Sequence, residues 1–222
     1  MASASPPLDP PGQAGGGGSS PVLALLARGL ELWLRGQCQA IEALEIELLG
    51  SGRQLLGGEL SGVRLRARRV RYRDLAIERV ELVSEPIRVR MGQLLRGAGQ
   101  LLDQPFAISG SVVFSGEGLR LSFSHDPWRT LGDALAEEAI GVAPLVGLRL
   151  DGDQLVLQAL PVGAEQPLEV STLLQVSDDG LNLHRGDGSL AARLPMDPNI
   201  HIERAEIASG LLELQGQATV LP

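Results

Sequence analysis

Hydrophobic residues near the amino terminus recur at the spacing of an α-helix. Between residues 22 and 40, apolar side chains follow one another at steps of three and four, and polar side chains keep the same steps on another face. This pattern predicts an amphipathic helix about 30 Å long with a wide apolar side. The apolar residues of the pattern are Leu23, Leu26, Leu30, Leu34, Cys38 and Ile41.

The pattern then changes to strict alternation, which is typical of β-strands. In ALEIELL, Leu44, Ile46 and Leu48 face one way, whereas Glu45 and Glu47 face the other. Similar alternation predicts further strands in GVRLRA, LAIERVEL, PIRVR and PFAISGSVVF. Because strands of this kind have one apolar face, something must cover it, and the amino-terminal helix is the natural cover.

A second short helix and several hairpins are predicted in the rest of the chain. Residues 127–139 have the composition of a helix, with Asp126 as N-cap and Pro127 at the first helical position. Turn dipeptides between alternating segments predict hairpins at Asp151-Gly152, Asp179-Gly180 and Ser209-Gly210. We therefore expect an α+β protein in which a strongly curved, mainly antiparallel sheet cradles a long amino-terminal helix.

The first 21 residues contain almost nothing that a folded protein could bury. They are rich in Pro, Gly and Ser, which is typical of a disordered tail. Residues 22–222 are long enough for one sizeable core, so we expect a single domain there. No segment approaches the roughly 18 to 20 apolar residues of a membrane-spanning helix, and no signal peptide is evident. We expect a location in the cytoplasm or peripheral on a membrane.

Residue types that common enzymes require are missing or poorly placed. All 19 basic residues are arginines, which excludes a Walker-type phosphate loop and Schiff-base chemistry, because both need lysine. Cys38 is the single cysteine, and the three histidines lack ligand spacing. Asp151 and Asp153 bracket a turn glycine, where aspartate is common. We expect no enzymatic activity, no metal site and no cofactor.

Arginines gather in one short stretch of an acidic chain. Residues 53–96 carry 11 arginines against 5 acidic residues, a net charge of +6, although the net charge of the chain is -8. Residues 97–222 carry 6 arginines against 17 acidic residues. This segregation can create a local positive field. The densest part holds six arginines: Arg64, Arg66, Arg68, Arg69, Arg71 and Arg73.

Alternation places these arginines along one side of a strand. Arginines two residues apart share a face at a spacing of about 7 Å. The phase of the alternation changes between Arg68 and Arg69, after which Val70 and Tyr72 take the apolar positions. If the apolar side still faces the core, this pair of arginines marks a β-bulge.

Three interpretations of the arginine face compete. The face can be merely solvated, with Glu45, Glu47, Glu78 or Glu81 neutralising part of it across strands. It can also dock on anionic lipid headgroups, where each basic group contributes about 1 kcal/mol. Nucleic acid is disfavoured, because the acidic remainder repels a polyanion and Tyr72 is the only aromatic residue beside the arginines for stacking.

Several motifs together resemble a known family. They are the helix with WLRGQC, the glycine-rich step into LSGVRLRARRVRYRDL, a strand ending in IRV, and the PF strand. Over residues 22–222 this pattern resembles the LmeA-like phospholipid-binding family, in the branch common in cyanobacteria. GEGLRL stands where the family commonly has an acidic helix start that contains Leu-Asn.

The resemblance implies a fold similar to the tubular lipid-binding proteins, and with it non-enzymatic binding or transfer of a phospholipid or glycolipid at a membrane surface. The expected partner is an anionic lipid or membrane surface, which the six arginines contact. The alternative is a structural or scaffolding module whose arginine-rich strand face docks an acidic protein. The mixed charges of the helix favour burial of its apolar side over insertion into a bilayer. The expected apolar lining is Leu26, Leu30, Trp33 and Leu34.

Overall fold

The computed structural model describes residues 21–88, 104–178 and 180–221. The predicted tail lies outside this part of the chain, except for Pro21, as does the end of the predicted strand PIRVR.

The amino-terminal helix forms where the spacing of apolar residues predicts it. It is α1 (Pro21–Gln37), and β1 (Ala40–Leu49) follows as soon as the sequence changes to alternation. Leu23, Leu26, Leu30 and Leu34 are all buried or half-buried, as expected of the side that packs. The charged residues of α1 are on another side, where Glu31 binds both neighbouring arginines of the helix.

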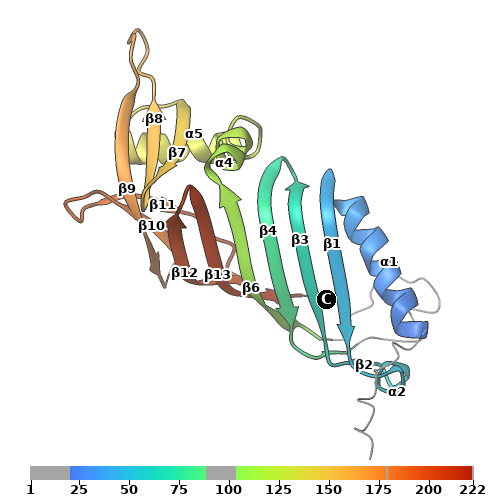
Figure 1. The fold of residues 1–222 in the computed structure, drawn as a ribbon. Helices are drawn as coiled ribbons and strands as arrows, with labels where there is room; N and C mark the ends of the chain where they lie inside the picture. The colour runs from blue at the N-terminus through green and yellow to red at the C-terminus, as the bar shows by residue number, and fades with distance from the viewer. Residues whose placement is uncertain (1–20, 89–103, 179, 222) are drawn as a thin grey trace, which may run out of the picture.

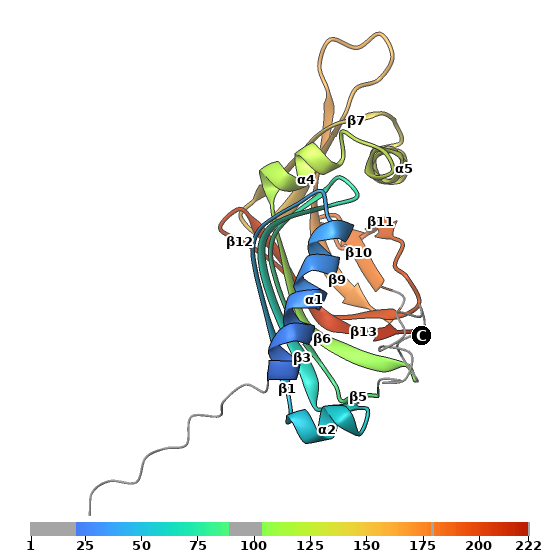
Figure 2. The same ribbon diagram turned by 90° about the vertical axis from the view of Figure 1, so that its right-hand side faces the viewer.

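Antiparallel pairing builds a six-stranded sheet from both ends of the chain. Its order is β1-β3-β4-β6-β13-β12, so β6 joins the amino-terminal strands to the carboxy-terminal hairpin (Figure 1). The long strands β1, β3 and β4 bend along their length (Figure 2). The other strands of this sheet are β3 (Gly62–Tyr72), β4 (Leu75–Ser84), β6 (Phe106–Ser115), β12 (Ile200–Ala208) and β13 (Leu211–Val220).

A second, five-stranded sheet has the order β11-β10-β9-β8-β7 and is also antiparallel. A small two-stranded sheet pairs β2 (Glu59–Leu60) with β5 (Ile87–Arg88). The strands of the five-stranded sheet are β7 (Leu145–Asp151), β8 (Gln154–Ala159), β9 (Leu168–Ser177), β10 (Gly180–His184) and β11 (Leu190–Leu194).

The predicted hairpins form at or within one residue of their turn dipeptides. Ser209-Gly210 connects β12 to β13 with φ of 53° and 73°, as predicted. Asp151 is the last residue of β7 and pairs with Gln154, so the turn from β7 to β8 is Gly152-Asp153, one residue later than predicted. Asp179 lies outside the described residues, but Ser177 pairs with Gly180, so β9 and β10 also form a hairpin. Turn chemistry therefore locates these hairpins to within one residue from sequence alone.

In the described part of the chain, three further helices connect or flank the sheets. They are α2 (Gly52–Leu56), α4 (Gly116–Ser122) and α5 (Trp128–Ile140). Helix α5 confirms the predicted helix near 127–139, but its N-cap is Pro127 without a side-chain cap bond. Asp126 accepts a hydrogen bond from Arg129 instead. The predicted capping by Asp126 is therefore wrong by one position.

Two hydrophobic clusters lie on the same face of the six-stranded sheet, which we call the inner face. The larger cluster joins this sheet to the five-stranded sheet and α5 through residues such as Phe114, Leu157 and Leu212. The smaller cluster joins α1, α2 and the two-stranded sheet, and its buried members are Leu23, Leu55, Leu60 and Ile87. The opposite face of the six-stranded sheet, which we call the outer face, carries the arginines of β3.

The phase change at Arg68 and Arg69 does not come from a β-bulge. β3 keeps one unbroken register against both β1 and β4, so no residue is inserted. Arg69 instead adopts a left-handed backbone, with φ of 48°. The burial patterns of β1 and β4 shift by one residue at the same level, next to Glu42 and Glu78. The predicted bulge is therefore wrong, because three strands change phase together in a coordinated kink.

These elements confirm an α+β fold with mainly antiparallel strands. A helix cradled by a strongly curved sheet is not confirmed. Helix α1 lies along β1, which is an edge strand of the six-stranded sheet (Figures 1 and 2). The single domain expected for residues 22–222 remains a prediction.

Candidate functional site

Five of the six predicted arginines form a row on the outer face of β3. Ala67 and Val70, which lie among them, are only 4% and 8% exposed and face inward. Arg73 lies beyond the end of β3, in the turn to β4, with φ of 48°. Its guanidinium lies over the ring of Tyr72, 5.3 Å from the centroid. The row proper therefore ends at Arg71.

Acidic residues of β1 and of the turn between β3 and β4 neutralise part of the row. Arg64 Nη1 lies 2.6 Å from an oxygen of Glu47, and Arg71 Nη2 lies 3.2 Å from Asp74. Arg69 binds Glu42 across the coordinated kink. The interpretation of a partly neutralised, solvated face is thus supported for these three arginines, and such exposed pairs contribute little to stability.

The pair of Arg69 and Glu42 changes the acid-base behaviour of both groups. Hydrogen bonding from Arg69 holds the pKa of the Glu42 carboxyl below its ordinary value. The same contact raises the pKa of Arg69. Both groups therefore stay charged at neutral pH and form an ion pair with each other.

Arg66 and Arg68 differ from the rest of the row, because neither forms an ion pair within the described part of the chain. Arg66 faces Glu45 and Glu81 in register, yet no nitrogen comes within ion-pair distance of either carboxylate. These two guanidiniums are the members of the row most available to an external anion.

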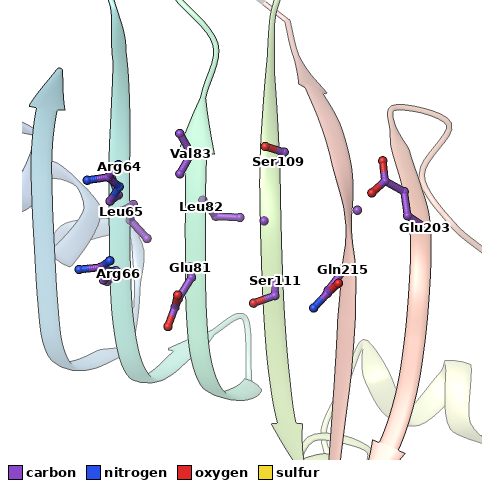
Figure 3. A pocket seen from close by; sticks show the side chains of 12 residues that line it. Arg64, Leu65, Arg66, Glu81, Leu82, Val83, Ser109, Ser111, Glu203 and Gln215 are labelled. Atoms are coloured by element: carbon purple, nitrogen blue, oxygen red, sulfur yellow. The ribbon is translucent and has the colours of Figure 1, made fainter. Parts of the chain in front are cut away.

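A hollow of about 380 Å³ crosses the outer face beside this row (Figure 3). Two lines of outward side chains bound it, and between them runs the main chain of Leu65, Leu82, Gly110 and Gly216, which are neighbours in register. The outward residues of the hollow are Arg64, Arg66, Glu81, Val83, Ser109, Ser111, Glu203 and Gln215.

The hollow offers hydrogen-bonding groups of both charges. Arg66 supplies a guanidinium without an ion partner, and Ser109 and Ser111 add hydroxyls. Glu203 enters from an irregularity in β12, where the register against β13 shifts, and accepts a hydrogen bond from Gln217. Such a surface can hold a small polar group by hydrogen bonds.

Glycine makes the floor of the hollow possible. A Cβ atom on Gly110 would lie 1.9 Å from the carbonyl oxygen of Glu81, and one on Gly216 would lie 2.1 Å from that of His201. Gly110 also has φ of 156°, which other residues rarely adopt. Gly110 and Gly216 pair with each other in register, so the strands that contain them approach their neighbours closely at the same level of the sheet.

The inner face at this level is apolar and only partly covered. Ile46, Leu65, Leu82 and Ile108 are half-buried, and none belongs to either hydrophobic cluster. They lie on adjacent strands, because Ile46 pairs with Leu65 and Leu65 pairs with Leu82. We call this surface between the two clusters the open middle of the inner face.

Helix α1 borders the open middle and carries the four residues predicted as apolar lining. Leu26 packs against the smaller cluster, and Leu30 and Leu34 are half-buried on the same side. Trp33 differs from these three, since it is 59% exposed. The structure thus brings the leucines together against the sheet side of the helix and leaves the indole at the surface.

Comparison with models of protein families identifies the family of this chain. Residues 17–217 match the model of LmeA-like phospholipid-binding proteins. The chain belongs to the LmeA-like phospholipid-binding family. The match covers most of the chain, so it includes both sheets and α1, and membership points to lipid binding.

Neither the curated proteins nor the solved structures contain a match to this LmeA-like chain. Among the residues that the structure describes, no helix is long and apolar enough to cross a membrane.

The two candidate surfaces of this LmeA-like protein lie on opposite faces of one sheet. Outward arginines such as Arg66 and inward residues such as Leu65 alternate along β3. A single phospholipid therefore cannot place its headgroup among the arginines and its acyl chains on the open middle without passing around the edge of the sheet. Headgroup contact by the arginine row remains a prediction, separate from acyl-chain binding.

Sequence reasoning missed the residues that later strands bring to the hollow. Ser109 and Ser111 come from β6, Gln215 from β13 and Glu203 from β12. Their meeting with Arg66 requires the strand order β3-β4-β6-β13-β12, which alternation alone does not give. The glycines within two long apolar strands were the available signal, since glycine in a strand often marks close approach of backbones.

Proposed function

We propose that this protein binds phospholipid without catalysing a reaction, and that the acyl chains lie on the open middle of the inner face beside α1. The observation that carries the proposal is the row of half-buried aliphatic side chains between two closed clusters, in a chain of a phospholipid-binding family. Handling or transfer of the lipid takes place at a membrane surface.

The chemistry of the open middle suits acyl chains. Ile46, Leu65 and Leu82 are aliphatic, and Gly110 beside them presents no side chain. Burial of apolar surface contributes roughly 25 cal/mol per Å², so an acyl chain that covers this strip gains free energy without any directional contact. Aliphatic side chains also give no preference between chains of similar length.

The placement of α1 supports the same proposal. The helix covers one edge of the sheet by packing on β1, and the five-stranded sheet closes the other end of the inner face through the larger cluster. A lipid between them would complete the packing and bring the helix and sheet closer to the cradled arrangement that the family resemblance implies. The arrangement favours a ligand that is itself apolar.

Two substitutions at neighbouring positions of β4 test the proposal. Leu82→Trp keeps the inner face apolar but fills the open middle, whereas Val83→Trp places the same indole on the outer face, in the hollow. Phospholipid extracted from the purified protein and quantified by mass spectrometry should fall about threefold or more in Leu82→Trp, because the added ring occupies the space of the acyl chains.

The matched variant should behave differently. Val83→Trp should keep the phospholipid content of the wild-type protein, and circular dichroism should show both variants folded. Loss of lipid from Val83→Trp but not from Leu82→Trp would move the lipid to the outer face. A wild-type protein that carries no phospholipid and takes none up from vesicles would refute lipid binding itself.

A further inference from the structure

Helix α1 has a second apolar side that packs against nothing in the described structure. Leu25 is 74% exposed, and Leu32 and Trp33 are each 59% exposed. At 100° per residue Leu25 and Leu32 lie on the side of the helix opposite Leu23, Leu30 and Leu34, whereas Trp33 lies about 80° further round the helix, on the flank next to Leu26. We call Leu25, Leu32 and Trp33 the exposed stripe.

Small and charged residues frame this stripe. Gly29 and Gly36 lie on the same side of the helix, and a Cβ atom at either would have no heavy atom within 4 Å. Arg28 and Arg35 lie on one flank and share Glu31 as their ion partner. Glu31 is the only acidic residue of α1, so two arginines outnumber it.

The arginine flank and the tryptophan flank of the helix face different surroundings. Arg35 Nη1 donates to the carbonyl oxygen of Ile41 at 3.0 Å, which places the charged flank at the free edge of β1. Trp33 lies about 160° around the helix from Arg35, given 100° per residue. The indole therefore lies on the flank directed toward the inner face and its open middle.

We infer that the exposed stripe of α1 docks the protein on an anionic phospholipid bilayer. This inference deepens the proposed function, since it assigns the surface through which the lipid site meets a membrane. Three large apolar side chains on one helix, one of them tryptophan, match the apolar side of an interfacial helix. Tryptophan is favoured at the boundary between headgroups and acyl chains.

Charge supports an anionic bilayer as the occupant. The two helices at this end, α1 and α2, carry Arg28, Arg35 and Arg53 against the single Glu31. Residues 97–222 carry 6 arginines against 17 acidic residues and hence repel such a surface. Attraction at one end and repulsion at the other orient the molecule with α1 toward the bilayer.

The same geometry excludes simultaneous contact by the arginine row. Leu25 and Leu32 of the exposed stripe point away from the sheet on its inner side, whereas Arg66 and Arg68 point away from the sheet on its outer side. One flat bilayer can therefore contact the stripe or the row, but not both. Docking by the stripe has the further consequence that the open middle lies next to the bilayer.

The decisive variant is Leu25→Gln with Leu32→Gln, with Leu121→Gln as the matched control. Leu121 is a 44% exposed leucine on α4, remote from α1. Flotation with vesicles of phosphatidylglycerol and phosphatidylcholine should show binding of the double variant weakened about tenfold or more, since two partly inserted leucines are lost. The control should bind within about twofold of wild type.

Charge reversal at Arg66 and Arg68 tests the alternative that the arginine row docks on the bilayer. If the stripe docks the protein, this variant binds vesicles as wild type does. Weakened binding there, together with wild-type binding by the double leucine variant, would overturn the inference. A wild-type measurement supports the same test: vesicles with brominated acyl chains should quench tryptophan fluorescence, and Trp33→Phe should abolish that quenching.

Lipid content separates failure of the inference from failure of the proposed function. The double leucine variant should still hold phospholipid when the lipid is supplied during purification, because the open middle is untouched. Vesicle binding that depends on the stripe, in a protein that never carries phospholipid, would support docking and refute the lipid site. Wild-type vesicle binding by the double variant would refute docking whatever the lipid content.

Discussion

The inner face of the six-stranded sheet is closed at its ends and open in its middle. At the larger cluster, Phe114 and Leu212 are 9% and 8% exposed beneath the five-stranded sheet. In the open middle, Leu65 and Leu82 face the same way on the same sheet but are only half-buried. The same alternating pattern thus produces both a core and a partly exposed surface. The difference is that the five-stranded sheet and α5 pack over one end of the inner face and not over its middle.

This comparison shows why alternation identifies a ligand surface poorly. The alternating pattern of β3 determines which residues face inward. In that pattern, however, Leu65 cannot be distinguished from a leucine of the core. Within the described residues, the placement of the five-stranded sheet and of α1 leaves Leu65 only half-buried. A lipid-binding surface and a core therefore differ in closure, which is a property of the whole fold.

The largest expected effect comes from breaking the sheet beneath the open middle. Gly110→Ala would force a Cβ atom to within 1.9 Å of the carbonyl oxygen of Glu81, at a backbone conformation that alanine rarely adopts. We expect a loss of stability of about 3 kcal/mol or more, measured by chemical denaturation. The hollow on the outer face and the open middle on the inner face should be lost together.

Gly29→Ala is the matched control for this substitution. A Cβ atom on Gly29 has nothing within 4 Å, and alanine favours a helix. We expect this variant to gain up to about 1 kcal/mol. Equal behaviour of the two variants would show that the backbones at Gly110 are not closely packed.

A smaller effect should separate the closed end from the open middle. Leu212→Ala removes a side chain from the larger cluster and should cost about 2 to 5 kcal/mol, because it leaves a cavity. Leu65→Ala should cost about 1 kcal/mol or less in the lipid-free protein, since its side chain is already partly solvated. Denaturation curves of the two variants measure the difference, and equal costs would contradict an open middle.

The smallest effect concerns the ion pairs of the outer face. The pKa of Glu42 is held below its ordinary value by Arg69, so the stabilisation from this pair is present above the ordinary glutamate pKa. It is lost as the pH falls through the lowered pKa. Thermal unfolding between about pH 5 and pH 3 should show a small decrease in stability that Glu42→Gln reduces. An unchanged decrease in that variant would assign it to other carboxylates.

Much of the fold could be predicted from the sequence. Spacing of apolar residues located α1 and β1, and turn dipeptides located the hairpins at Gly152 and Gly210. These features depend on local chemistry that neighbouring residues determine. The family resemblance was also confirmed by the match over residues 17–217.

The candidate site was harder to predict, because its parts meet only through strand order. The charge of residues 53–96 suggested a strongly basic surface, but β1 places Glu42 and Glu47 against that row. The same pairing excluded the bulge predicted at Arg68 and Arg69, since the neighbouring strands change phase with β3. Interactions between strands are invisible in the pattern of any one strand.

The coordinated kink ties the lengths of three strands together. At its level, Glu42 in β1, Arg69 in β3 and Glu78 in β4 lie side by side while both registers stay continuous. Deleting one of these residues would turn half of its strand over relative to the other two, so that leucines and arginines would exchange sides. Insertions and deletions at this level are therefore tolerated only when all three strands change in concert.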